Sequence, residues 1–164
     1  MRTGDNAFPA GARLNRVLGV LRLLHANSGK IGISKLASLS HSNVDYLLHE
    51  VSVAKMLGMI KVSKSGVVQI TRLGEQVYHH EQPGIEEVAK RLRSIEPFRT
   101  AFEISKTDNG FAVDDLARIL TSKKTVWHTE KQKNISEVKL MLMQWAIYFR
   151  ILAYDGRDGL WFKG

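Results

Sequence analysis

The 164-residue chain contains no cysteine, and no apolar run in it approaches the length of a membrane-spanning helix. The absence of cysteine excludes disulfide bonds and thiolate chemistry. A membrane helix needs roughly 20 mostly apolar residues, so we expect no membrane insertion. The N-terminus, with Asp5 and Pro9, also lacks the apolar core of a signal peptide. Because 44% of the residues are hydrophobic, the sequence can build the core of one moderate domain or of two small ones. The lack of cysteine and of targeting segments predicts a cytoplasmic protein.

Acidic residues are scarce in the first half of the chain. Residues 1–80 contain 10 Lys or Arg against 4 Asp or Glu, a net charge of +6, whereas residues 81–164 contain 14 against 12, a net charge of +2. A basic surface that neutralises phosphates releases counterions, which gives affinity for nucleic acid without sequence preference. Alternatively, these basic residues form only an ordinary solvated surface. The charge distribution therefore predicts that any DNA binding is weak, salt-sensitive and located in the first half.

Motifs for catalysis are also missing. Gly29-Lys30 has Leu24 where an ATPase phosphate loop has its first glycine, and no Ser or Thr follows Lys30. The six histidines contain no pair spaced by four residues with a glutamate between them, as in a zinc protease helix. His79-His80 near a helix end is more typical of exposed side chains that stabilise the helix dipole. We therefore predict no enzymatic activity, no metal and no cofactor.

The first half predicts three helices followed by a hairpin. Apolar residues repeat every three or four positions over residues 14–24, 33–37 and 44–57, and Gly58 is expected to end the third helix. Residues 59–63 and 67–71 are rich in strand-forming residues and flank a Lys-Ser-Gly turn, and a short helix is expected after them over residues 73–80. This order is typical of a winged helix-turn-helix.

The second half predicts helices and a C-terminal hairpin. Helical periodicity is found over residues 85–95, from Pro97 to about residue 106, and over residues 113–120, and it is lost over residues 121–133. Residues 134–137 resemble a capping box for a last helix that contains Trp145 in its apolar stripe. Two Asp-Gly pairs, at Asp155 and Asp158, supply the positive φ values of a tight turn before residues 160–162.

A turn cluster over residues 79–84 divides the halves. We predict a mainly α protein with small β-hairpins, built as two tandem winged helix-turn-helix-like halves that pack together. The expected parts are a flexible N-terminal tail over residues 1–11, a first winged-helix domain over residues 12–82 and a second, helical winged-helix-like domain over residues 83–164.

A family resemblance is carried by three groups of residues. They are Val44-Asp45, Leu47-Leu48, Val51, Ala54 and Leu57-Gly58; Val68 to Thr71 with Gly74; and, most specifically, Trp145, Tyr148, Ile151-Leu152 and Ala153-Tyr-Asp155. Over about residues 14–162, the chain resembles the C-terminal AAA-associated domain, the module found behind the ATPase subunit of nitrate/sulfonate/bicarbonate-type ABC importers. The resemblance implies a winged-helix regulatory domain whose partner is a transporter ATPase, with that ATPase on another chain or on a removed part.

Two surfaces are candidates for a protein partner. If Val44, Leu47, Leu48 and Val51 face the core, the opposite side of the third helix carries Tyr46, His49 and Val53. The second surface is the basic segment over residues 121–133, where a tryptophan among lysines is typical of an interface anchor or of a ring that covers the core. The predicted partner-binding residues are Tyr46, His49, Val53, Trp127, Lys123 and Lys124.

DNA is the second partner considered. The outward face of the third helix offers no arginine for reading guanine, and only Asn43 at its edge could read adenine. Basic residues of the first helix and the hairpin could still contact phosphates. The predicted nucleic-acid contacts are Asn43, Ser42, Arg13, Arg16, Arg22, Lys61 and Lys64.

The sequence thus favours a non-enzymatic docking module that acts by protein–protein interaction. A DNA-binding transcriptional regulator that uses the basic first half is the alternative, and a small-anion sensor in a cleft between the halves is a third hypothesis.

Overall fold

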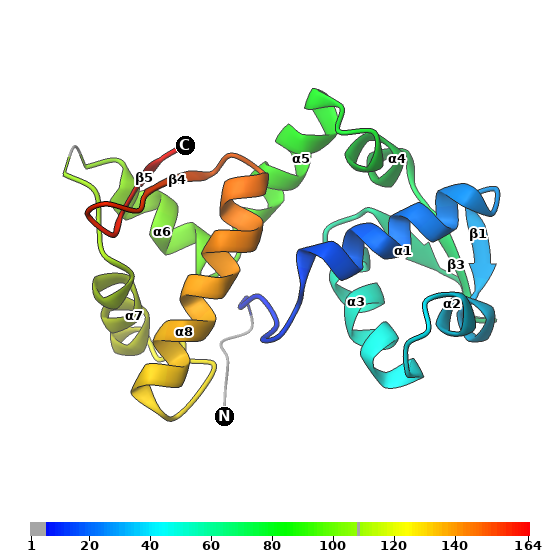
Figure 1. Cartoon of the computed structure of the whole chain (residues 1–164), viewed down its shortest axis with the longest axis horizontal. Coiled ribbons are helices and arrows are strands. Elements are labelled where there is room, and N and C mark those ends of the chain that lie inside the picture. The colour runs from blue at the N-terminus through cyan, green and yellow to red at the C-terminus, as the bar shows by residue number, and fades with distance from the viewer. Residues whose placement is uncertain (1–5, 108) are drawn as a thin grey trace. The chain divides into compact units, whose positions relative to one another are not determined.

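The computed structural model describes residues 6–107 and 109–164, which form two compact units (Figure 1). We call Ala12–Val88 the N-terminal unit, and residues 6–11 together with Ala89–Gly164 the C-terminal unit. Helix accounts for 55% of the chain, and the strands form small antiparallel sheets, which confirms the mainly α prediction. No helix within the described residues is long and apolar enough to cross a membrane.

The N-terminal unit contains four helices and a three-stranded sheet. In chain order these are α1 (Leu14–Ala26), β1 (Lys30–Gly32), α2 (Ile33–Leu39), α3 (Val44–Met56), β2 (Ile60–Val62), β3 (Val67–Ile70) and α4 (Arg72–Tyr78). Strand β3 lies in the middle and pairs antiparallel with both β1 and β2. The predicted helices and the hairpin are present, whereas β1 was not predicted, because three residues are too few to show an alternating pattern.

Helix α4 is held close to the turn before β2. The Thr71 hydroxyl caps α4 by accepting a hydrogen bond from the Gly74 amide (3.1 Å) and donates one to the Gly58 carbonyl (2.7 Å). A side chain at Gly74 would collide with the backbone carbonyl of Met59, so only glycine permits this approach. These contacts fix α4, and with it Glu75, against the rest of the unit.

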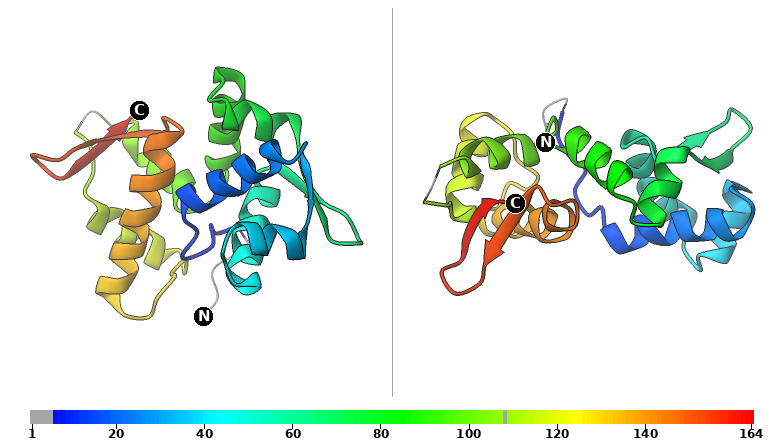
Figure 2. Two further views of the ribbon diagram at one scale, coloured as in Figure 1. Left: turned by 45° about the vertical axis from the view of Figure 1, so that its right-hand side comes forward. Right: turned by 90° about the horizontal axis from the view of Figure 1, so that it is seen from above.

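The C-terminal unit is built around a long helix and a hairpin. Helix α5 (Gln82–Leu92) leads into it and is followed by α6 (Phe98–Ser105), α7 (Val113–Ser122) and α8 (Lys131–Met141). Helix α8 continues into a π-helical segment, η1 (Leu142–Ala146), and the chain ends in the antiparallel hairpin β4 (Leu152–Asp155) and β5 (Leu160–Lys163). Figure 2 shows the hairpin after the end of this helix from two further directions. The hairpin predicted from the Asp-Gly pairs is confirmed, but of their two glycines only Gly159 has a positive φ, +66°.

The prediction of a capping box at residues 134–137 is wrong. Helix α8 begins at Lys131, and Asn134 is buried inside it. The Asn134 Oδ1 atom accepts hydrogen bonds from the backbone amides of Trp127 (2.8 Å) and His128 (3.3 Å). Asn134 therefore secures the loop that precedes the helix instead of capping the start of the helix.

The described part of the expected N-terminal tail packs into the C-terminal unit. The Phe8 side chain is fully buried, with its ring centroid 5.2 Å from that of Phe98 and 5.0 Å from that of Trp145. The Phe8 amide donates a hydrogen bond to the Glu96 carbonyl (2.7 Å). Phe8 thus anchors this segment in the core, because an aromatic ring gains more by burial than by exposure to water.

Candidate partner-binding surface

Exposed apolar side chains gather on α2 and α3. Among the described residues, six large hydrophobic side chains are exposed, and all but Ile147 belong to these two helices: Leu39, Val44, Tyr46, Leu48 and Met56. Val44, Leu48 and Met56 are separated by multiples of four residues, so they share one stripe of α3, with exposed Ser52 between them. We call Val44, Leu48, Ser52 and Met56 the α3 stripe. Large apolar side chains gathered on one exposed helix face are typical of protein–protein interaction sites.

The buried face of α3 differs from the prediction. Leu47 and Val51 are buried as expected, but Val44 and Leu48 are 47% and 46% exposed, and Val53 is fully buried. Apolar residues are distributed around most of α3, so their spacing alone does not select one inward face. Contacts with α1, α2 and β2 make that choice.

A pocket of about 250 Å³ adjoins the other flank of α3. Its lining includes Arg16, His41, Tyr46 and Glu50. The Arg16 guanidinium lies 4.0 Å from a Glu50 carboxylate oxygen and 5.9 Å from the centroid of the Tyr46 ring. Arg16 is thus placed between a buried acid and an exposed aromatic ring.

Glu50 is the buried acid of the N-terminal unit. Its side chain is 5% exposed, and its Oε2 atom has no hydrogen-bond partner among the described residues. Burial raises the pKa of Glu50, although His49, Arg16 and a backbone hydrogen bond from Arg13 act in the opposite direction. The buried Nε2 atom of His49 also lacks a partner in the described part of the chain. Neither group was predicted to be buried, because the predicted inward face of α3 excluded both His49 and Glu50.

The predicted partner-binding residues divide into exposed and buried ones. Tyr46 is 64% exposed, His49 is half-buried, and Lys124 is exposed. The assignments of Val53 and Trp127 to a surface are wrong, because these side chains are 0% and 3% exposed. The Trp127 indole reaches the core by donating a hydrogen bond to the Phe8 carbonyl (2.6 Å).

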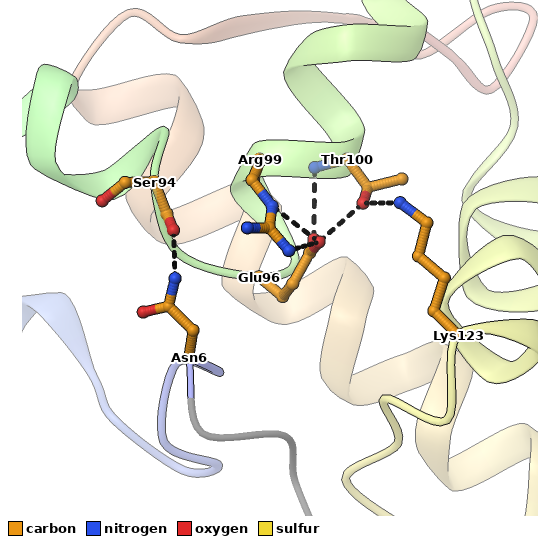
Figure 3. A network of polar contacts seen from close by, with 6 residues as sticks. All are labelled: Asn6, Ser94, Glu96, Arg99, Thr100 and Lys123. Atoms are coloured by element: carbon orange, nitrogen blue, oxygen red, sulfur yellow. Dashed lines mark hydrogen bonds and ion pairs between the residues drawn. The ribbon is translucent and has the colours of Figure 1, made fainter.

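Lys123 belongs to a polar network around a buried glutamate, which the sequence did not indicate (Figure 3). The Glu96 carboxylate accepts hydrogen bonds from the Thr100 amide (3.2 Å) and hydroxyl (2.8 Å) and from the Arg99 guanidinium (3.1 Å). Lys123 Nζ in turn donates to the Thr100 hydroxyl oxygen (3.1 Å). The network caps the start of α6 and ties α7 to it, which is a structural role.

The predicted nucleic-acid contacts are exposed, but two of them serve the fold. Asn43 Oδ1 accepts a hydrogen bond from the Asp45 amide (2.7 Å) and caps α3, and the Ser42 hydroxyl donates to the Ser40 carbonyl (3.3 Å). The five cations among the predicted contacts are all exposed: Arg13, Arg16, Arg22, Lys61 and Lys64. Lys61 lies opposite Gln69 in the sheet, and so does Lys30 from the other side, which forms a polar row across the three strands.

The family model of the C-terminal AAA-associated domain matches residues 34–155, well over half of the chain, from α2 to the end of β4. The chain belongs to the C-terminal AAA-associated domain family. No curated protein and no solved structure matches it. The AAA-associated domain is not itself a catalytic domain, and membership suggests an association with AAA or ABC ATPases.

The α3 stripe lies within the matched part of this AAA-associated domain. Helix α1 and strand β5 lie outside the matched range. The resemblance predicted from the Val44 to Gly58 segment and from the Trp145 to Asp155 segment is thereby confirmed.

Proposed function

We propose that this AAA-associated domain is a non-enzymatic regulatory module that docks on an ABC-importer ATPase through the α3 stripe. Its N-terminal unit would then be a winged helix-turn-helix used for protein binding, and the helical C-terminal unit a second, winged-helix-like half. The observation that carries the proposal is the exposure of Val44, Leu48 and Met56 on one stripe of a helix. A folded unit gains nothing from exposing such side chains, whereas their burial in an interface is favourable.

The same helix is poorly suited to reading DNA. Its exposed charged residues are Asp45 and Lys55, so this helix presents no net positive charge that would attract phosphates. Asn43, the one residue that could read adenine, already accepts a hydrogen bond as the helix cap. DNA binding in the alternative function would therefore depend on backbone contacts from the exposed cations of α1 and of the sheet.

The proposal is tested with the purified chain and the ATPase subunit of an ABC importer encoded beside it. We expect micromolar or tighter binding that Leu48→Asp weakens at least tenfold, because a charge at the centre of the stripe would be buried in the interface. Ile147→Asp is the matched control, since Ile147 is 40% exposed but lies in the C-terminal unit. Equal binding by both variants would exclude the α3 stripe as the docking surface.

A separate measurement tests the alternative function, DNA binding. Nanomolar binding to one DNA site over random duplex at physiological salt, lost in Asn43→Ala, would establish a transcriptional regulator instead.

A further inference from the structure

Two histidines and a glutamate meet where the last turn of α1 lies beside α4. His25 belongs to the last turn of α1, Glu75 to the first turn of α4, and His79 follows the end of α4. His25 Nδ1 lies 2.8 Å and His79 Nε2 lies 3.5 Å from the Glu75 Oε2 atom. One nitrogen or oxygen from each residue lies within 4.8 Å of the others. This three-residue cluster lies entirely in the N-terminal unit.

The fold places the three side chains at the same point. Glu75 and His79 are four residues apart, so they share one side of α4. Thr71 and Gly74 fix the start of that helix, as described above. The Tyr78 ring packs against His25, with 4.5 Å between the centroids, and restricts the imidazole. The cluster is thus partly preorganised by contacts that do not involve its ligand atoms.

The separations from Glu75 to each histidine are close to those of a tetrahedral zinc ion, and the ligand atoms of the two histidines lie within 4.8 Å of each other. Ligand bonds of about 2.0–2.1 Å place neighbouring ligand atoms about 3.3 Å apart. The separation of His79 and Glu75, 3.5 Å, is close to that value, and the hydrogen-bonded pair of His25 and Glu75 needs to widen by only about 0.5 Å. Imidazole and carboxylate together favour zinc over magnesium or calcium, which prefer oxygen ligands alone.

We propose that His25, Glu75 and His79 bind a zinc ion whose fourth position is open to water. His25 and His79 are exposed and Glu75 is half-buried, so an ion can enter from solvent. The ion would join the end of α1 to α4, independently of the docking proposed for α3. The zinc motif sought in the sequence has both histidines on one helix. A site with one histidine from each of two segments does not fit that motif and was therefore not predicted.

A second ion pair in the chain provides a contrast. His128 Nε2 lies 3.5 Å from Glu137 Oε2, the same separation as for His79 and Glu75. Among the described residues, no second histidine joins this pair in a group of three ligands. His128 therefore serves as the matched control for a histidine that meets a glutamate without forming a metal site.

The test is a titration of the untagged full chain with ZnCl2 after removal of metals by a chelator. We expect one zinc per chain by calorimetry, at micromolar or tighter affinity. Loss of a second-shell partner commonly costs 10–100-fold in metal affinity, so His25→Ala and His79→Ala, which remove ligands, should each weaken binding at least tenfold. His128→Ala should leave the affinity unchanged. Zinc should also raise the melting temperature of the parent chain and of His128→Ala, but not of His79→Ala.

Two results would contradict the zinc site. The first is no binding by the parent chain at millimolar zinc, and the second is equal zinc affinity in the parent, His25→Ala and His79→Ala. Melting curves recorded without zinc show whether each variant folds. Should His25→Ala fail to fold, Glu75→Gln keeps the size of the side chain and must still weaken zinc binding at least tenfold.

Discussion

The Trp127 indole donates a hydrogen bond to the backbone carbonyl of Phe8, 2.6 Å away and 119 residues earlier in the chain. Phe8 in turn contacts the rings of Phe98 and Trp145. This arrangement joins the N-terminal segment, the loop before α8 and the last helix into one core. The segment over residues 121–133 therefore contributes a buried side chain to the core, while all four of its lysines remain exposed.

We predict that Trp127→Ala destabilises the C-terminal unit as strongly as Trp145→Ala does. Each replacement of a buried tryptophan by alanine should lower the free energy of unfolding by about 3–5 kcal/mol. Trp127→Phe, which keeps a ring but leaves the Phe8 carbonyl unpaired, should cost about 1–3 kcal/mol. Denaturant unfolding followed by circular dichroism measures all three. An unchanged unfolding transition in Trp127→Ala would show that this side chain does not support the core.

Phe8→Ala should also destabilise the C-terminal unit, by about 3–5 kcal/mol, since its ring is fully buried. Tryptophan fluorescence reports this unit alone, because all three tryptophans, Trp127, Trp145 and Trp161, belong to it. Tyr46→Ala is the control, because a ring that is 64% exposed should change stability by no more than about 0.5 kcal/mol. Equal unfolding midpoints for Phe8→Ala and the parent, followed by tryptophan fluorescence, would show that residues 6–11 do not support the core.

Glu50→Gln should stabilise the N-terminal unit at neutral pH. Because burial raises the pKa of Glu50 above its usual 4.5, the folded chain binds more protons than the unfolded chain. The stability contributed by the protonated group is therefore complete below pH 4.5 and is lost as the pH rises through the folded pKa. Glutamine removes this loss. We expect a gain of about 1 kcal/mol at neutral pH, which shrinks toward acidic pH.

The measurement is thermal unfolding by circular dichroism between acidic and neutral pH. Glu81→Gln replaces an exposed glutamate of the same unit and should follow the parent at every pH. Parallel curves for Glu50→Gln and the parent would mean that burial does not raise the pKa of Glu50.

Random duplex DNA should bind weakly and with strong salt dependence. Each phosphate contact contributes about 0.9 to the slope of log affinity against log salt, so Lys61→Ala should reduce the slope by about one if its side chain meets a phosphate. Lys133→Ala is the control, because this lysine pairs with Glu130 in the C-terminal unit (3.1 Å). The slopes are measured by fluorescence anisotropy at several salt concentrations. A slope unchanged by Lys61→Ala would show that Lys61 does not contact DNA.

The sequence by itself determined the elements whose signals are local. The three-four spacing of apolar residues predicted α1 and α7, and the Asp-Gly pairs predicted the β4–β5 hairpin, where Gly159 has a φ of +66°. Such signals are readable because they depend on residues only a few positions apart. The family resemblance was readable for the same reason, since it rested on short segments such as Trp145 to Asp155.

Only the tertiary structure decided which side chains are available to a partner or a ligand. Apolar residues surround α3, so its neighbours had to select the buried face that leaves Val44 and Leu48 exposed. Trp127 is buried because a carbonyl 119 residues away accepts its N–H, and His25 meets Glu75 across 50 residues. Contacts between residues so distant leave no periodic trace in a single sequence, because burial and ligand geometry belong to the packed chain and not to any one segment of it.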